Sequence, residues 1–284
     1  MKIRLASFIV LFFAAQLAFA QKAPLCGTTH SSAAPGRMAA LVSNRSFRMS
    51  HPVPAKMRFQ SSMAKSITYK TSDGKTASAM EWKAAKPTKN YLLVIHEWWG
   101  LNDQVKAEAE KLFTTLGNVN VIALDLYDGK STSNRDEAGK LMQGASQDRI
   151  ISIVKGALAY AGPSARIGTI GWCFGGAWSL QSALLAGKQE IACVMYYGMP
   201  EQDVNRLKTL NSDVLGIFGN KDKFINPKVV SEFKANMAKA GKKLVLKQYD
   251  ADHGFANPSN PIYDKLATAD AWKNTIAYLK PKFK

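Results

Sequence analysis

From about residue 66 onward, short apolar runs alternate with longer segments that carry apolar residues at helical spacing. Residues 91–95 read YLLVI, a continuous run typical of a strand that is buried on both faces. Two shorter runs flank Asp73-Gly74, which predicts a hairpin. The predicted strands span residues 66–69, 77–82, 91–95, 119–124, 166–171, 191–197, 214–218 and 244–249.

Helices are predicted between most of these strands. They span residues 103–116, 136–160, 175–186, 227–240 and 265–279. Gly117 follows the first helix where a left-handed cap is expected, Gly144 predicts a break in the second, and Pro227 begins the fourth. The alternation indicates an α/β fold with a mostly parallel, twisted sheet and helices on both faces. Ligands of such folds bind at the carboxyl ends of the strands, so chemistry is expected there.

The first 20 residues have the pattern of a bacterial secretory signal peptide. Lys2 and Arg4 precede a short apolar stretch, and Ala18-Phe19-Ala20 forms a small-x-small cleavage site. We expect a periplasmic or secreted protein without stable membrane insertion after cleavage. An uncleaved N-terminal anchor is the alternative.

Residues 21–65 show poor periodicity and contain four prolines. We interpret them as a tether or an extension that lies across the domain formed by residues 66–284. A short helix near residues 39–42, packed on the core, is the alternative.

Composition excludes several classes of protein. The 284 residues are 46% hydrophobic, which is typical of a globular chain, and three cysteines are too few for a disulfide scaffold. Cys193 lies in a predicted strand and is interpreted as a core residue, whereas Cys26 could be free or could form a crosslink. The net charge of +17 is distributed over scattered lysines, and no nucleic-acid-binding motif is present. We expect no nucleic-acid partner, and binding to anionic polymers is the competing interpretation.

The most informative motif is Gly171-Trp172-Cys173-Phe174-Gly175-Gly176, which lies between a predicted strand and a predicted helix. This pattern matches a nucleophile elbow with cysteine in the usual serine position. The helix N-terminus favours a thiolate at Cys173, and the Phe174 N–H points to where an oxyanion would form. A purely structural buried cysteine is the alternative.

Two later strand ends supply a base and an acid. His253 follows the strand that ends at residue 249, and Asp222 follows the strand that ends at residue 218. The order Cys173, Asp222, His253 is the nucleophile–acid–histidine order of α/β-hydrolases. Asp250 and Asp252 compete with Asp222 for the role of acid.

Glu97 is an unexpected carboxylate. It follows strand 91–95 within His96-Glu97-Trp98-Trp99-Gly100, in the loop that supplies the second oxyanion donor in α/β-hydrolases. A capping or ion-paired glutamate is the alternative, and His96 is interpreted as structural. No clustered spacing of metal ligands is present, so no metal or cofactor is expected.

Together, HEWWG, Asp125-Leu126-Tyr127, the Cys173 elbow, Asp222 and His253-Gly254-Phe255 resemble the dienelactone hydrolase family over residues 66–284. The resemblance implies an α/β-hydrolase fold of about eight strands. It also implies a triad of Cys173, His253 and Asp222, with oxyanion N–H groups from Phe174 and Trp98. In this family pattern Glu97 holds the resting thiol and deprotonates it when substrate displaces the carboxylate.

The same resemblance suggests the substrate contacts. Arg135 matches one of two arginines that bind the substrate carboxylate, and Asn257 stands where the second is found. One arginine would hold a carboxylate less firmly than two. The aromatic residues Trp98, Trp99, Trp172 and Tyr127 could line a more apolar acyl pocket.

We therefore predict an exported, monomeric hydrolase of small esters or lactones that uses a cysteine nucleophile. A non-catalytic binding module on the same scaffold is the alternative, because a stalled thioester would bind without turnover.

Overall fold

The computed structural model describes residues 34–284. The predicted signal peptide and Cys26 lie outside the described residues. Eight strands form one sheet in the order β1-β2-β4-β3-β5-β6-β7-β8, and every pair from β4 to β8 in that order is parallel. The strands are β1 (Ala64–Lys70), β2 (Thr76–Trp82), β3 (Asn90–Ile95), β4 (Asn120–Leu124), β5 (Arg166–Trp172), β6 (Glu190–Tyr196), β7 (Val214–Gly219) and β8 (Leu244–Tyr249).

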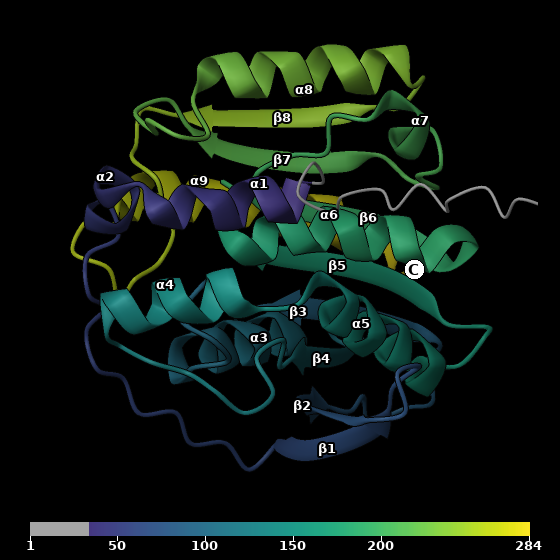
Figure 1. Cartoon of the computed structure of the whole chain (residues 1–284). Coiled ribbons are helices and arrows are strands. Elements are labelled where there is room, and N and C mark those ends of the chain that lie inside the picture. The colour runs from purple at the N-terminus through teal and green to yellow at the C-terminus, as the bar shows by residue number, and fades with distance from the viewer. Residues whose placement is uncertain (1–33) are drawn as a thin grey trace, which may run out of the picture.

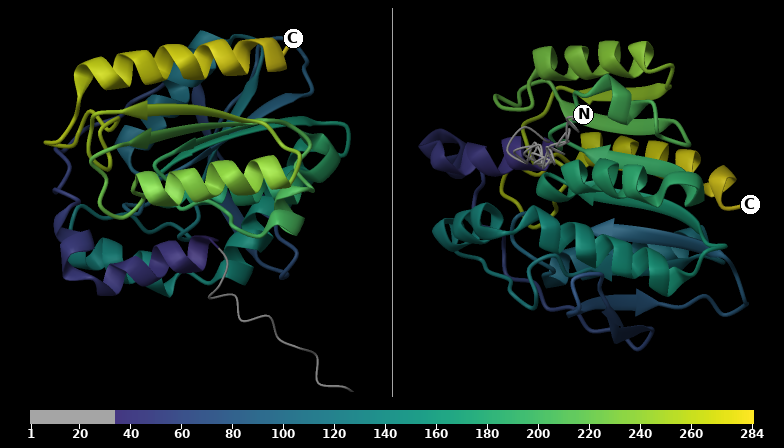
Figure 2. Two further views of the ribbon diagram at one scale, coloured as in Figure 1. Left: turned by 90° about the horizontal axis from the view of Figure 1, so that it is seen from above. Right: turned by 45° about the vertical axis from the view of Figure 1, so that its right-hand side comes forward.

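Helices cover both faces of this sheet, which confirms the predicted α/β class (Figures 1 and 2). Helices α3 and α9 lie on one face, and α5, α6 and α8 lie on the other. The major helices are α3 (Asp103–Leu116), α4 (Arg135–Gly144), α5 (Gln147–Ala161), α6 (Phe174–Ala186), α8 (Pro227–Lys239) and α9 (Lys265–Lys282). Within residues 34–284, no helix combines the length and apolar character needed to cross a membrane.

Local sequence signals set most helix ends. The Asn102 side chain accepts a hydrogen bond from the Val105 N–H at the start of α3, and Gly117 ends that helix with φ 84°. The predicted break at Gly144 is confirmed: α4 ends there, and Ser146 caps α5. The short helices η3 (Gly187–Gln189) and α7 (Val204–Leu207) were not predicted, because they lack an amphipathic repeat.

Among the described residues before the sheet, 34–63, there are three short helical segments: α1 (Ala34–Ala40), η2 (Leu41–Ser43) and α2 (Arg45–Met49). Helix α1 packs against α6, and α2 lies beside α4 (Figure 1). Met38 and Phe47 are fully buried, so this region belongs to the core. We call residues 34–54 the covering segment.

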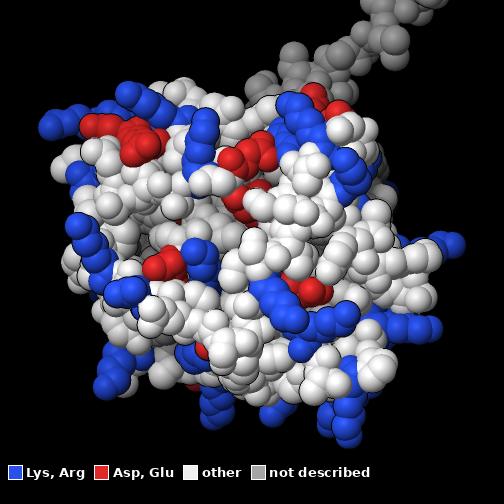
Figure 3. All heavy atoms as spheres, turned by 90° about the horizontal axis from the view of Figure 1, so that it is seen from below, with Lys and Arg blue, Asp and Glu red and all other residues white. Residues whose placement is uncertain are grey.

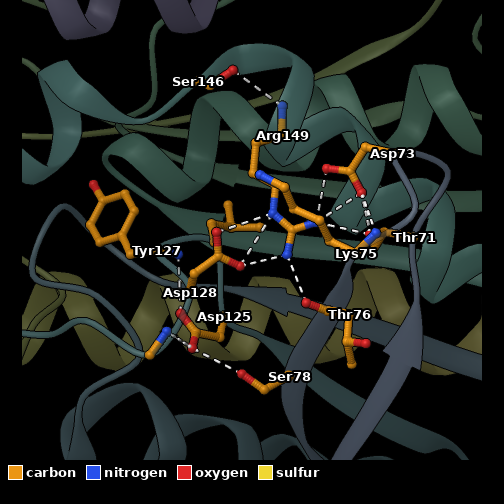
Figure 4. A network of polar contacts seen from close by, with 12 residues as sticks. Thr71, Asp73, Lys75, Thr76, Ser78, Asp125, Tyr127, Asp128, Ser146 and Arg149 are labelled. Carbon is orange, nitrogen blue, oxygen red and sulfur yellow. Dashed lines mark hydrogen bonds and ion pairs between the residues drawn. The ribbon is translucent and has the colours of Figure 1, made fainter.

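A polar cluster around Arg149 ties α5 to two loops, and we call it the Arg149 cluster (Figure 4). The Arg149 guanidinium donates hydrogen bonds to Asp128 (2.6 Å) and Asp73 (3.1 Å), and also to the Thr76 carbonyl (2.8 Å). Nearby, Asp125 accepts from the backbone N–H groups of Tyr127 and Gly129. Asp125, the aspartate of the Asp-Leu-Tyr motif, therefore stabilises a turn.

Charged side chains do not form a single block on the face shown in Figure 3. Lys and Arg are scattered there among patches of Asp and Glu. This face therefore offers no continuous cationic surface for a polyanion.

Candidate active site

Cys173 lies at the sharp turn between β5 and α6. Its φ of 54° is unusual for a non-glycine residue, as expected at a nucleophile elbow. A Cβ on Gly171 would lie 2.1 Å from the Gly175 carbonyl oxygen, and one on Gly175 would lie 2.3 Å from the Ile95 carbonyl oxygen. The glycines on either side of Cys173 are thus required by close backbone contacts.

His253 and Asp222 meet beside this turn. The His253 Nδ1 lies 2.5 Å from Asp222 Oδ2, and both side chains are buried. Asp222 Oδ1 also accepts from the N–H groups of Phe224 and Ile225, which fixes the carboxylate. A ring nitrogen of His253 lies within 4.8 Å of Cys173 Sγ. The structure therefore brings the three predicted triad residues together, with Asp222 rather than Asp250 or Asp252 beside the histidine.

Burial and charge shift the pKa values of the triad. Burial raises the pKa of Cys173, although nearby His253 opposes this change. Burial alone would lower the pKa of His253, but the Asp222 carboxylate and Cys173 outweigh it and raise that pKa well above 6.5. Burial would raise the pKa of Asp222, but His253 and the hydrogen bonds outweigh it and lower that pKa. Burial therefore disfavours the thiolate of Cys173, whereas the Asp222 carboxylate favours a positive charge on His253.

Of the two predicted oxyanion donors, Phe174 contacts the sulfur. Phe174 is the first residue of α6, and its N–H faces Cys173 and helps to lower the thiol pKa against the larger effect of burial. Trp98 follows β3 in a turn closed by the Gly100 N–H to the Glu97 carbonyl (3.3 Å). Both residues lie at the carboxyl end of the sheet, where the predicted role places them.

Glu97 does not hold Cys173 in the way that the family resemblance implied. Its carboxylate accepts from Asn257 Nδ2 (2.7 Å) and the Tyr197 hydroxyl (3.3 Å). Burial raises the pKa of Glu97, and the Asn257 hydrogen bond opposes that change. Because Asn257 replaces the expected arginine with a neutral amide donor, this position engages the glutamate rather than presenting a cation to a substrate.

The partner of the thiol is His51, which the sequence did not single out. Cys173 Sγ lies 3.6 Å from His51 Nε2, and the two imidazole rings of His51 and His253 lie 4.8 Å apart. His51 also packs against Phe47 and Trp98, with ring centroids 4.5 Å apart in each case. Burial and the nearby His253 lower the pKa of His51 to about 3, so it is neutral at pH 7. No local pattern around His51 could have revealed this placement.

The other residues predicted to contact the substrate do not all lie at the site. Trp99 and Tyr127 are buried near the site, where Trp99 packs on Trp98 and Tyr127 lies beside Phe174. Arg135 does not reach the cysteine, because its Nε donates to the His51 carbonyl (2.9 Å). It instead lines a cavity of about 640 Å³ together with Arg45 and Arg48. Trp172 packs on Tyr196.

Access to the cysteine is restricted. Cys173 is only 1% exposed, and the covering segment places Phe47 and His51 over the site. A cavity of about 410 Å³ reaches His253 from one side, lined by Met49, Pro52, Phe224 and Ile262 among others. His96 is bonded to the Glu97 carbonyl and the Leu126 N–H, consistent with its structural interpretation.

Comparison with known proteins shows which family this chain resembles. Residues 78–283 match the family model described as "Dienelactone hydrolase family". The chain belongs to the dienelactone hydrolase family. The protein called "Protein usf" from Aquifex pyrophilus is 31% identical over 202 residues, which cover 66% of this chain and 87% of that protein. "Carboxymethylenebutenolidase 1" from Cupriavidus pinatubonensis is 24% identical, over 68% of this chain and 88% of its own length.

Solved structures support the fold of this dienelactone hydrolase family member. A dienelactone hydrolase-like promiscuous phosphotriesterase from metagenomic libraries has a TM-score of 0.67 at 20% identity, covering 78% of this chain and all of that one. The family match, together with the relatives named as carboxymethylenebutenolidases, supports a lactone or ester hydrolase, whereas the solved structures show the fold.

Proposed function

We propose that this family member hydrolyses small esters or lactones with Cys173 as its nucleophile. The main support for this proposal is that Cys173, at a strained elbow, lies close to the buried His253–Asp222 pair. The elbow presents the sulfur, the histidine accepts its proton, and the aspartate fixes the Nδ1–H tautomer.

The reaction proceeds in two halves. The sulfur attacks the carbonyl carbon while the thiol proton moves to His253 Nε2, and the N–H groups of Phe174 and Trp98 face the oxyanion. The tetrahedral intermediate expels the alcohol oxygen, which takes the proton from His253, and an acyl thioester remains. Water then attacks the thioester and gives its proton to His253, which returns it to the sulfur as the carboxylic product leaves. Because Glu97 is engaged by Asn257 and Tyr197, His253 is the base in this scheme.

The substrate is proposed to be a small, uncharged acyl compound. Trp98, Trp99 and Tyr127 give the surroundings of Cys173 an aromatic character. The guanidinium of Arg135 is directed to the covering segment, and the second expected arginine is Asn257. These two features support esters and lactones that carry no free carboxylate group. Substrate reaches the sulfur when Phe47 and His51 move aside.

We also propose that the enzyme acts in the periplasm or outside the cell. The support is the sequence of residues 1–20, with a basic start, a short apolar stretch and a small-x-small site. Detection of a mature chain beginning at Gln21 by N-terminal sequencing would test it.

The decisive experiment compares the mature protein with Cys173→Ala, using Cys193→Ala as a matched control at the second buried free cysteine within residues 34–284. A short-chain nitrophenyl ester and a dienelactone serve as substrates, with chelator present. We expect turnover in the wild type and in Cys193→Ala, a preference for the neutral ester, and loss of turnover in Cys173→Ala. A single burst without turnover would instead support the binding module, and equal rates in all three proteins would refute the cysteine nucleophile.

A further inference from the structure

Three potential metal ligands meet in the buried site. Cys173 Sγ and one ring nitrogen each of His51 and His253 all lie within 4.8 Å of one another. They come from the covering segment, the β5–α6 elbow and the loop after β8, so only the tertiary structure unites them. All three residues are buried.

Both imidazoles are oriented in the manner of metal-bound histidines. His51 Nδ1 lies 2.7 Å from the Phe47 carbonyl oxygen, and His253 Nδ1 lies 2.5 Å from the Asp222 carboxylate. Because both oxygens act as acceptors, each Nδ1 carries a hydrogen, so Nε2 is the nitrogen of each ring that would bind a metal ion once the ring is neutral. Metal-binding histidines almost always have such an outer hydrogen-bond partner. His253 Nε2 is buried and has no hydrogen-bond partner of ordinary geometry among the described residues.

The spacing of His51 and Cys173 fits two ligands of a tetrahedral ion. Zn²⁺–N bonds of about 2.0 Å and Zn²⁺–S bonds of about 2.3 Å imply an N···S separation of about 3.5 Å between two ligands. The observed separation of His51 Nε2 from Cys173 Sγ is 3.6 Å. Three protein ligands leave a fourth position for water, and the cavity that reaches His253 provides a route of entry.

We propose that His51, Cys173 and His253 bind a borderline-soft divalent ion of the Zn²⁺ type. Binding replaces the thiol proton by a sulfur–metal bond and releases that proton to solvent. The ion also joins the covering segment to the elbow. Because it occupies both the nucleophile and the base, the bound form cannot carry out the hydrolysis proposed above. Ion binding itself does not depend on that activity, so the two proposals can fail separately.

Metal affinity can be measured directly on tag-free, metal-depleted mature protein. Titration with Zn²⁺ against a chromophoric chelator gives the stoichiometry and Kd, and Co²⁺ reports a thiolate ligand through its charge-transfer absorption. We expect one ion per chain and a sulfur-to-Co²⁺ band. We also expect an affinity loss of at least about 100-fold in Cys173→Ala and in His51→Phe, since loss of an outer partner alone costs 10- to 100-fold. Cys193→Ala is the matched control and should bind as the wild type does.

Several outcomes would overturn the site. These are Zn²⁺ binding equal in wild type and Cys173→Ala, a Co²⁺ adduct without the sulfur band, or full affinity in folded His51→Phe. His51→Gln provides a second variant if the phenylalanine perturbs packing, as judged by near-ultraviolet circular dichroism. If the ester is hydrolysed, Zn²⁺ should inhibit the wild type far more than His51→Phe. An inactive protein that still binds Zn²⁺ through Cys173 would refute the proposed hydrolysis and leave the metal site standing.

Discussion

The Arg149 cluster and the Cys173 site are both polar groups tied together across distant segments, but they differ in how completely they are satisfied. Arg149 donates to Asp73, Asp128 and the Thr76 carbonyl, so its charge is shared by two carboxylates (Figure 4). In the Cys173 site, His253 Nε2 has no hydrogen-bond partner of ordinary geometry among the described residues, and the contact of the thiol with His51 is long, at 3.6 Å. Polar groups whose hydrogen bonds are all made hold loops in place. Buried polar groups that lack a hydrogen-bond partner remain available for chemistry.

The largest expected effect comes from exchanging one carboxylate in each region. Asp222→Asn should reduce kcat/KM for a nitrophenyl ester by about 10²- to 10⁴-fold, because the amide no longer stabilises the required histidine tautomer and its charged form. Asp128→Asn is the matched control in the Arg149 cluster, and asparagine tolerates the φ of 50° at that position. Its kcat/KM should stay within about twofold of wild type. Comparable losses in both variants would remove the functional distinction between the regions.

The covering segment should contribute strongly to stability. Phe47 is fully buried against His51, Phe224 and His253. Phe47→Ala is expected to lower the free energy of unfolding by about 3 kcal/mol, measured by urea denaturation. Met49→Ala, at a residue 53% exposed, should change it by less than about 0.5 kcal/mol. A loss below about 1 kcal/mol at Phe47 would mean that the segment does not unfold with the domain.

The pH dependence of hydrolysis should follow His253. Asp222 raises the pKa of this histidine against the opposing effect of burial, and a protonated imidazole cannot accept the thiol proton. At a pH below that pKa, kcat/KM should therefore rise about tenfold per pH unit as neutral His253 is restored. Asp222→Asn should shift this rising part of the pH profile to lower pH. A profile that is flat between about pH 6 and 8, or an unmoved limb, would argue against His253 as the base.

The smallest effect is expected in the Arg149 cluster. Arg149→Met removes the links to Asp73 and Asp128, and we expect Tm to fall by a few degrees at low salt and by less at high salt. The esterase activity should be retained. The same Tm change at both salt concentrations would show that packing rather than charge accounts for the role of Arg149.

Sequence patterns alone predicted the α/β architecture, the eight strands, the elbow around Cys173 and the convergence of Asp222 and His253. These features depend on short-range signals, namely apolar strands, glycines at close contacts and residues placed directly after parallel strands. Because parallel strands end at the same edge, their order along the chain sets the meeting of the triad.

Only the tertiary structure decided the partners of Glu97, the orientation of Arg135 and the position of His51 beside Cys173. His51 lies 122 residues from that cysteine, in a segment without regular periodicity. Its place follows from the burial of Met38 and Phe47 against the folded domain. Such packing depends on the shape of a surface that forms only when the whole sheet has assembled, and no local pattern of residues encodes it.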